Sequence, residues 1–410
     1  MYSTETSRVV AGPSLRVLHL DHSDEFGGAE LALARMLRTR PRWQSVLVLP
    51  QNLARRDDSL SPFNGLEQFG VQIARVGPPS RVGASRSHGL LSLAKFVFNT
   101  GRQVVAVGRV VRKARPHFVW ANSSRAAVYT ALIPWVRSTM LVVHLRDRID
   151  VDSLGRFGYL AMTRLVLPRA GVVIANSTST LASARPYFRA GVKTKTLQSP
   201  LGIARASSRG KALAGSDQGQ RIRIGMLARL DPWKGQHLVI QAFAHLRTQT
   251  TRDLSLHLAG GAEFGQEAYS EELHQLIQDL DLADSVVFAG RVDDVTQFID
   301  EMDICVQYST RPEPLGQNVL QYLARGRAVL VAAEGGPAEW IRHGDNGLHV
   351  RPRSVSALAK GLLDVVEDDD RRDELACAAL ETPNLLTDGE VADEAAAFLE
   401  NCMRMRGDSN

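Results

Sequence analysis

Short apolar runs separated by segments of helical periodicity recur along the whole chain. In the first half, the apolar runs predict strands at residues 14–20, 45–49, 70–76, 117–120, 139–144 and 170–175. In the second half they predict strands at 221–227, 254–259, 285–289, 304–307 and 328–332. Strands that alternate with helices are typical of α/β proteins with parallel sheets. The pattern therefore predicts two doubly wound α/β domains.

A small polar segment divides the two series of strands. Residues 206–220 are rich in Ala, Gly and Ser and predict a linker. The expected organisation is a first Rossmann-like domain at 1–205, this linker, a second at 221–385, and a C-terminal helix with a polar tail at 386–410. A chain of 410 residues is long enough for two such domains.

The stretch around Glu313 has the strongest functional signal. A buried strand is expected to end at Tyr308, Pro312 and Pro314 stiffen the loop that follows, and a helix is expected from Asn318. The loop would bring Glu313 to the end of the strand, and Gly316 would leave the first N–H groups of the helix open to an anion. The alternative is an ordinary strand-to-helix turn with a solvated glutamate.

Two further strand-to-helix loops carry candidate ligand-binding residues. Arg229 and Lys234 flank one loop, where fixed cations suit phosphate oxygens. Gly27 and Gly28 open the helix after the first strand and permit close backbone approach. They do not form the three-glycine dinucleotide fingerprint, which disfavours a hydride-transfer cofactor. The alternatives are two exposed basic residues and a tight turn.

His144 is the candidate in the first half of the chain, because it ends a predicted strand. Ligands collect at the carboxyl ends of strands in open α/β sheets, although a satisfied core histidine is the alternative. Asp150 and Asp152 have a carboxylate spacing that could suit a metal, but we interpret them as a solvated loop. No metal site is expected.

The charge of the chain is strongly asymmetric. Residues 1–216 hold 31 basic and 11 acidic residues, a balance of +20, whereas residues 217–410 hold 18 and 33, a balance of −15. Twelve basic residues and no acidic one lie between Glu67 and Asp147. Such a bias predicts an anionic partner or an anionic membrane surface for the first domain, with a merely solvated basic face as the alternative.

No signal peptide or membrane-spanning run is expected from the sequence, and three widely spaced cysteines fit a reducing compartment. We therefore expect a cytoplasmic protein, with attachment to the membrane surface as a further possibility. The sequence has no nucleic-acid-binding signature.

Six motifs occur in an order that resembles the group 1 glycosyltransferases, known as glycosyltransferase family four. The motifs are Gly27-Gly-Ala-Glu30, Val143-His-Leu, Ala228-Arg-Leu-Asp-Pro-Trp-Lys-Gly235, Phe288-Ala-Gly-Arg, Arg311-Pro-Glu-Pro-Leu-Gly316 and Gly335-Gly-Pro-Ala-Glu339. The resemblance implies the GT-B fold, in which two doubly wound Rossmann-like domains face each other across a cleft. It also implies a nucleotide-sugar donor, retention at the anomeric carbon and no required metal or cofactor.

The resemblance also assigns roles to the candidate residues. Arg229 and Lys234 would neutralise the donor diphosphate, and the backbone at Leu315, Gly316 and Gln317 would hold its distal phosphate. Glu313 would face the hydroxyls of the donor sugar. His144 would lie against the transferred sugar, and the loop of Gly27 and Gly28 would close over the donor.

Gln321 departs from the family pattern, because the family has a second acid at this position that grips the donor ribose. A neutral amide still forms hydrogen bonds to ribose hydroxyls but without assistance from charge. An acid at 321 is therefore expected to support donor binding at least as well. The departure leaves two alternatives open: a degenerate GT-B protein that only binds, or a sugar-nucleotide epimerase. The acceptor is expected to be anionic or membrane-associated, for instance lipid-linked.

Overall fold

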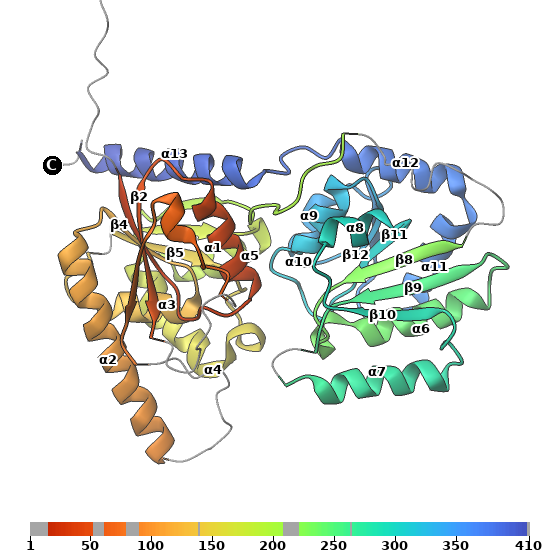
Figure 1. Cartoon of the computed structure of the whole chain (residues 1–410), viewed down its shortest axis with the longest axis horizontal. Coiled ribbons are helices and arrows are strands. Elements are labelled where there is room, and N and C mark those ends of the chain that lie inside the picture. The colour runs from red at the N-terminus through yellow and green to blue at the C-terminus, as the bar shows by residue number, and fades with distance from the viewer. Residues whose placement is uncertain are drawn as a thin grey trace, which may run out of the picture. The chain divides into compact units, whose positions relative to one another are not determined.

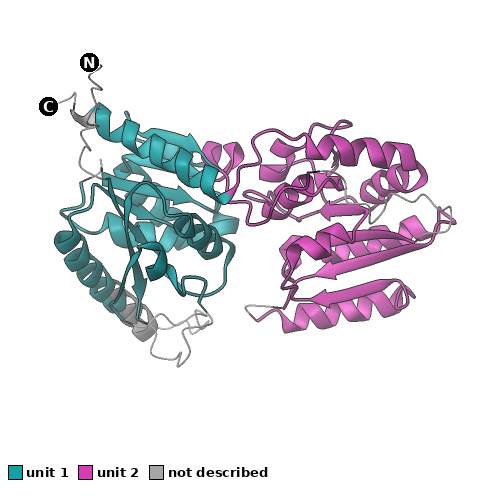
Figure 2. Ribbon diagram, turned by 45° about the horizontal axis from the view of Figure 1, so that its top comes forward, with its two compact units in different colours: residues 1–175, 184–197, 388–410 teal, residues 176–183, 198–387 magenta. Residues whose placement is uncertain are grey.

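The computed structural model describes residues 15–51, 61–78, 90–137, 140–207, 221–262 and 265–407 (Figure 1). Most of the expected linker, residues 208–220, lies outside this description. The chain forms two compact units (Figure 2). Unit 1 comprises residues 1–175, 184–197 and 388–410, and unit 2 comprises residues 176–183 and 198–387. The segment 176–183 thus groups with unit 2, although it lies between two strands of the first domain in the sequence.

Unit 1 contains a seven-stranded sheet in the order β3-β2-β1-β4-β5-β6-β7, and every neighbouring pair is parallel. Its strands are β1 (Arg16–Leu20), β2 (Gln44–Pro50), β3 (Gln72–Val76), β4 (Phe118–Ala121), β5 (Leu141–Leu145), β6 (Val172–Ala175) and β7 (Lys193–Thr196). Its helices are α1 (Gly28–Arg38), α2 (Leu90–Ala114), α3 (Ser124–Ala131), α4 (Val151–Ala161) and α13 (Asp388–Gly407), and a π-helical segment spans Met162–Val166. The short helix α5 (Thr178–Ala184) spans the boundary between the two units.

Unit 2 contains a six-stranded parallel sheet in the order β10-β9-β8-β11-β12-β13. Its strands are β8 (Ile222–Leu227), β9 (Leu254–Ala259), β10 (Val286–Gly290), β11 (Ile304–Gln307), β12 (Ala328–Ala332) and β13 (Leu348–Val350). Its helices are α6 (Gln236–Arg247), α7 (Glu267–Asp279), α8 (Val295–Asp300), α9 (Gln317–Ala324), α10 (Gly335–Trp340), α11 (Val355–Glu367) and α12 (Asp369–Leu380).

The central strand β11 shows why the sheet of unit 2 is stable. Successive side chains of a strand point to opposite faces. Ile304 and Val306 belong to one buried apolar cluster, whereas Cys305 belongs to a second. Both clusters consist of residues that are almost fully buried, so the sheet is covered on both faces, as parallel sheets generally are.

Both sheets contain a topological switch point, where the order of strands reverses. The switch lies between β1 and β4 in unit 1 and between β8 and β11 in unit 2. Loops on either side of a switch diverge, so a crevice forms beyond the carboxyl ends of the strands, and ligands bind there. The loops after β1, β4, β8 and β11 are therefore the places to look for a site.

The expectation of two doubly wound parallel domains is confirmed, and the predicted strands are all present. Two strands escaped the sequence pattern, the polar edge strand β7 and the three-residue β13. The interpretation of Asp150 and Asp152 as a solvated loop is wrong for Asp152, which lies in the first turn of α4, whereas Asp150 precedes this helix and caps it by accepting a hydrogen bond from the Ser153 N–H at 2.8 Å. No helix within the described ranges is long and apolar enough to cross a bilayer.

A close backbone approach holds the Glu313 loop in place. The Gly336 N–H donates to the Glu313 carbonyl at 2.8 Å. A Cβ at Gly336 would lie 2.4 Å from the Pro314 carbonyl oxygen and 2.7 Å from the Leu315 Cα. These atoms belong to backbone, which cannot rotate away as a side chain could. The first turn of α10 thus requires a residue without a side chain.

We therefore expect Gly336→Ala to destabilise the protein by about 2 kcal/mol, within the usual range for overpacking. Thermal unfolding measures this as a lower Tm. The matched control is Gly389→Ala, where a new Cβ would have no neighbour within 4 Å. Equal Tm values for both variants would contradict the close approach.

Candidate active site

A largely buried ion pair joins the two loops at the switch point of unit 2. Lys234 Nζ lies 2.8 Å and 2.9 Å from the two carboxylate oxygens of Glu313. The two side chains are only 18% and 12% exposed. The Ser309 hydroxyl also donates to Glu313 at 2.8 Å. The structure thus brings together two residues that lie 79 positions apart and that the sequence singled out separately.

The loop around Trp233 sets the position of Lys234. Asp231 caps the short 3₁₀ turn Pro232–Lys234 by accepting from the Trp233 N–H, and Gly235 then adopts a φ of 81° before α6 begins. Two cations contact the Trp233 ring, with Lys234 Nζ 4.0 Å and the Arg311 guanidinium 4.4 Å from its centroid. The Trp233 carbonyl accepts from the Thr310 N–H at 2.8 Å. The two loops are therefore fixed to each other by backbone as well as by charge.

Arg229 lies at the start of the same loop, next to β8. Its guanidinium is 3.3 Å from the Asp231 carboxylate, and its side chain is 39% exposed. A guanidinium carries five N–H groups in a fixed fork, a geometry that suits the oxygens of carboxylates and phosphates.

The start of α9 has the local geometry that the sequence predicts, and its binding of an anion stays a prediction. Gly316 is the N-cap residue with a φ of 75°, a conformation that favours glycine. The first N–H groups of a helix, here those of Gln317 and Asn318, have no preceding turn to bond to and attract negative charge. The Leu315 side chain is 5% exposed and packs in the apolar core, so only its backbone is available to a ligand.

Gln317 and Gln321 lie on the inner side of α9. The Gln317 amide donates to the carbonyls of Pro200 and Leu201 at 2.9 Å and 3.3 Å. The Gln321 amide donates to the same Leu201 carbonyl at 3.0 Å, and Gln321 is 5% exposed. Sequence spacing placed Gln321 one helical turn from the anion seat but gave no sign of this backbone partner.

His144 lies at the end of β5 in unit 1 and is 4% exposed. Its ring centroid is 5.4 Å from that of Trp120, and neither ring nitrogen has a hydrogen-bond partner among the described residues. Burial, with the nearby charge of Arg146, holds the pKa of His144 well below its usual value. The imidazole is therefore neutral near pH 7.

His19 of β1 is a buried neighbour of this region that the sequence did not single out. Its Nε2 accepts from the Trp43 indole N–H at 3.1 Å, and burial lowers the pKa of His19 to about 3. His19 also contacts the Trp120 ring, with the centroids 5.4 Å apart. Two neutral histidines thus line the interior beneath the carboxyl edge of this sheet.

The two glycines before α1 have different surroundings. A Cβ on Gly27 would lie 2.3 Å from a carboxylate oxygen of Glu30, so glycine is required there for Glu30 to fold back over the helix start. Gly28 is exposed, and a Cβ there would have no neighbour within 4 Å. Gly28 therefore has open space beside its backbone, and contact with a ligand there stays a prediction.

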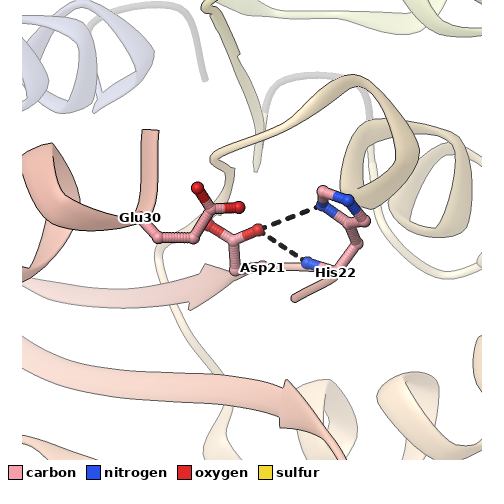
Figure 3. Close-up of side chains that lie close together, drawn as sticks. All are labelled: Asp21, His22 and Glu30. Carbon is pink, nitrogen blue, oxygen red and sulfur yellow. Dashed lines mark hydrogen bonds and ion pairs between the residues drawn. The ribbon is translucent and has the colours of Figure 1, made fainter. Parts of the chain in front are cut away.

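Glu30 belongs to a polar cluster at the switch point of unit 1, together with Asp21 and His22 (Figure 3). One ligand-type atom from each of the three residues lies within 4.8 Å of the others. Asp21 is fully buried and accepts from the Asn122 amide at 2.6 Å and from the His22 N–H at 2.7 Å. Asp21 and Asn122 directly follow β1 and β4, and this location is the signal that could have found them.

The surroundings of the cluster of Asp21, His22 and Glu30 favour a proton on Glu30. Burial first, and the Asp21 carboxylate second, raise the pKa of Glu30 to about 7. The Arg146 guanidinium donates to Asn122 at 2.9 Å, and burial lowers the pKa of Arg146 to about 10. The three residues have the chemistry to ligate a divalent cation, but Arg146 already supplies positive charge beside them. A proton on Glu30 therefore suits this cluster better than a metal ion.

A protein-family model matches most of the second half of the chain. Residues 215–382 match the family model of the glycosyl transferases group 1. This segment of the chain is therefore similar to the group 1 glycosyltransferases. The ion pair of Lys234 and Glu313, the anion seat and both glutamines all lie within it.

Curated relatives of the chain include two bacterial enzymes. The lipopolysaccharide core biosynthesis glycosyltransferase LpsE of Rhizobium meliloti is 34% identical over 36% of this chain and 41% of its own length. A GDP-mannose-dependent phosphatidylinositol monomannoside mannosyltransferase of Mycobacterium tuberculosis is 29% identical over 49% of this chain and 51% of its own. The chain thus spans about half the length of the curated relatives it matches, or less.

Solved structures extend the likeness to nearly the whole chain. Anabaena HepE, crystallised with UDP and glucose, matches 94% of this chain and 99% of its own with a TM-score of 0.73 and 25% identity. Sucrose-phosphate synthase of Thermosynechococcus elongatus matches 95% of this chain and all of its own with a TM-score of 0.75, but at 17% identity it shows the fold alone.

The raised pKa of Glu30 makes stability depend on pH. Below about pH 4.5 the side chain is protonated in both folded and unfolded chains, whereas above pH 7 folding must bury its charge. Wild-type stability should therefore fall between pH 4.5 and 7. A shift from 4.5 to about 7 corresponds to a cost on the order of 3 kcal/mol at pH 8.

We expect Glu30→Gln to match the wild type at pH 4 and to exceed it in unfolding free energy at pH 8, as measured by urea denaturation. Glu67→Gln, at an exposed position of the same unit, is the control and should show no such dependence on pH. A Glu30→Gln effect that is equal at both pH values would show that Glu30 ionises normally.

Proposed function

We propose that the protein is a retaining, metal-independent glycosyltransferase that moves a sugar from a nucleotide-sugar donor to an acceptor. The observation that carries the proposal is the ion pair of Lys234 and Glu313 beside the first turn of α9. A cation, an acid and an open helix start are together what a sugar diphosphate requires. The presence of UDP in the HepE crystals, and the GDP-mannose named for the mycobacterial relative, support a nucleotide-sugar donor.

The proposed chemistry follows from where charge develops. Breaking the bond between the sugar and the diphosphate leaves positive charge on the ring and negative charge on the leaving phosphate. Arg229 and Lys234 would stabilise that phosphate together with the N–H groups at Gly316 and Gln317, which is electrostatic stabilisation aimed at the transition state. Three such groups would also supply the positive charge for which other enzymes use a metal ion.

Glu313 would have two tasks in this scheme. Its carboxylate holds the Lys234 ammonium in place, and it accepts from Ser309, so its orientation is fixed before the donor binds. A preoriented carboxylate is suited to accept hydrogen bonds from the hydroxyls of the donor sugar. Fixing both groups in advance lowers the reorganisation that the reaction would otherwise require.

For unit 1 we propose that His144 faces the transferred sugar and that the loop of Gly27 and Gly28 contacts the donor. Since the His144 imidazole is neutral, it would act as a hydrogen-bonding group and not as a permanent charge. Its two ring nitrogens have no partner among the described residues, which supports a role toward a ligand.

The first test of the proposal concerns turnover. Glu313→Ala and Lys234→Ala should each lower the rate of transfer or donor hydrolysis on the order of a hundredfold, since each removes a preoriented charge. The assay uses a panel of UDP- and GDP-sugars. Arg221→Ala is the matched control, because Arg221 forms an exposed ion pair with Asp253 before β8, at the opposite edge of the sheet.

Circular dichroism would confirm that the variants fold. Near-normal rates in both active-site variants would refute the site. Retained binding of nucleotide without turnover in the wild type, over the whole panel, would instead favour a protein that binds nucleotide sugars without transferring them.

We propose further that the acceptor is anionic or lies at an anionic membrane, and that unit 1 meets it from the cytoplasmic side through α2. Phe98, Arg102, Val105, Arg109 and Arg112 recur at the spacing of one helical face, and all five are exposed. Phe98 is 65% exposed and Val105 50%. Four of these residues line a hollow of about 620 Å³. Apolar side chains among arginines suit the boundary between lipid headgroups and acyl chains.

Binding through α2 should depend on charge. We expect the protein to sediment with vesicles that contain anionic lipid and not with neutral vesicles, and the bound fraction should fall at high salt. Reversing the charges of Arg109, Arg112 and Lys113 should lower the bound fraction without changing donor hydrolysis. Each basic residue near such a surface contributes about 1 kcal/mol.

The matched control reverses three exposed basic residues of unit 2, namely Arg221, Arg291 and Arg351. This variant has the same net charge as the α2 variant. It therefore distinguishes an effect of the α2 surface on vesicle binding from an effect of the overall charge. The proposal for α2 would be overturned if both variants lost the same fraction of vesicle-bound protein. Equal sedimentation of the wild type with neutral and anionic vesicles would also overturn it.

A further inference from the structure

Four ring side chains pack together on one face of the sheet of unit 1. His19 of β1 pairs with Trp120 of β4, and Trp120 pairs with Val142 of β5, two residues before His144. His19, Trp120 and His144 therefore point to the same face. The Trp120 centroid lies 5.4 Å from that of each histidine and 6.3 Å from that of Trp43, just before β2. We call Trp43, His19, Trp120 and His144 the tryptophan–histidine cluster.

One hydrogen bond in this cluster fixes where His19 carries its proton. The Trp43 indole N–H donates to His19 Nε2 at 3.1 Å. Because an indole nitrogen can only donate, Nε2 must offer a lone pair, and the neutral ring carries its single proton on Nδ1. Burial, which lowers the pKa of His19 to about 3, agrees with a neutral ring. His19 thus has one buried N–H group, at Nδ1.

Four polar atoms of the cluster have no hydrogen-bond partner among the described residues. They are His19 Nδ1, Trp120 Nε1 and both ring nitrogens of His144. None of the three side chains is more than 4% exposed. Buried polar groups nearly always have a partner, and an ordered water supplies it where no protein group does. Unmatched atoms on three adjoining rings therefore indicate an internal ligand.

The chemistry of these atoms selects a water molecule as that ligand. His19 Nδ1–H and Trp120 Nε1–H both donate, so the ligand must accept twice, which a metal cation cannot do. A water accepts two hydrogen bonds, and beyond these it can only donate. The neutral His144 ring has one N–H group and one nitrogen with a lone pair. The nitrogen that faces the water must therefore be the one with the lone pair.

We propose that His19, Trp120 and His144 hold one internal water molecule, and that Trp43 acts through His19 and this water to keep the His144 proton on the ring nitrogen turned away from the water. Trp43 and His19 are thus positioning residues for His144. The water site itself requires no donor. Its bearing on transfer rests on the proposed function, in which His144 would offer an N–H to the sugar and would not take up a proton from it.

A crystal structure of the full chain tests the water site directly. One ordered water should lie within about 3 Å of His19 Nδ1, Trp120 Nε1 and one ring nitrogen of His144. A structure without this water, or with an ion in its place, would overturn the proposal.

NMR on protein labelled with ¹⁵N at its histidines tests the positions of the protons, because protonated and unprotonated ring nitrogens differ clearly in chemical shift. Loss of signals in His19→Phe and His144→Phe assigns the spectra. At pH 7 we expect His19 to carry its proton on Nδ1 and His144 to adopt a single neutral tautomer. Trp43→Phe removes the donor to His19 Nε2, so His19 can move its proton there. The water then regains an acceptor position, and His144 should become a mixture of both tautomers.

Trp120→Phe is a second variant with the same expected effect on His144, because it also frees one acceptor position of the water while a ring is kept. Trp135→Phe is the matched control, since that indole belongs to the same unit and is 49% exposed. It should leave the signals of His19 and His144 unchanged. A merely structural role for Trp43 would lower Tm and leave His144 in one tautomer, which would overturn its role as a positioning residue.

Turnover separates this inference from the proposed function. Trp43→Phe should lower the rate of transfer by up to about tenfold, the value of one neutral hydrogen bond. If the wild type transfers no sugar from any donor of the panel, the proposed function fails, and the water and the tautomers can still be measured. If the wild type is active but Trp43→Phe keeps its rate while His144 changes tautomer, the positioning role alone is overturned.

Discussion

The ion pair of Lys234 and Glu313 is the interaction on which the proposed site depends. Each residue lies on a loop that leaves the carboxyl edge of the sheet, and the two loops flank the switch point between β8 and β11. Burying an ion pair is costly in itself, so such a pair is weak evidence for stability. Its value here is geometric, because it brings a cation and an acid to the same crevice and is supported by Ser309 and by the Trp233 loop.

Most of this arrangement could be predicted from sequence, and the physical reason is that its parts are local. A strand, a turn with fixed dihedral angles and a helix start are each set by a few neighbouring residues, as around Gly235 and Gly316. The core strands were predictable because they are continuous apolar runs. The edge strand β7, with the sequence Lys-Thr-Lys-Thr, was not, since a solvated edge needs no apolar alternation.

What sequence could not predict depends on partners that are distant in the chain. Gln321 bonds to a carbonyl 120 residues away, and nothing in its own helix indicates this. The Asn122 amide reaches Asp21, 101 residues earlier in the chain, because the strand order brings β4 beside β1. In both cases the sequence shows that the side chain is polar. Its hydrogen-bond partner, however, follows only from how the chain folds.

The polar groups of the two units have different neighbours, and these neighbours determine which charges are favoured. Unit 2 places a basic and an acidic side chain in direct contact, with Lys234 Nζ 2.8 Å from a carboxylate oxygen of Glu313. Unit 1 buries His144 without an acid beside it and Glu30 beside a second carboxylate, so both are driven toward their neutral forms near pH 7. Fixed charge is thus concentrated where the diphosphate is proposed to bind. Neutral hydrogen-bonding groups remain on unit 1, which is proposed to face the transferred sugar. The charge of the sugar ring changes during the proposed reaction. A fixed charge beside the ring would therefore stabilise only one of its charge states.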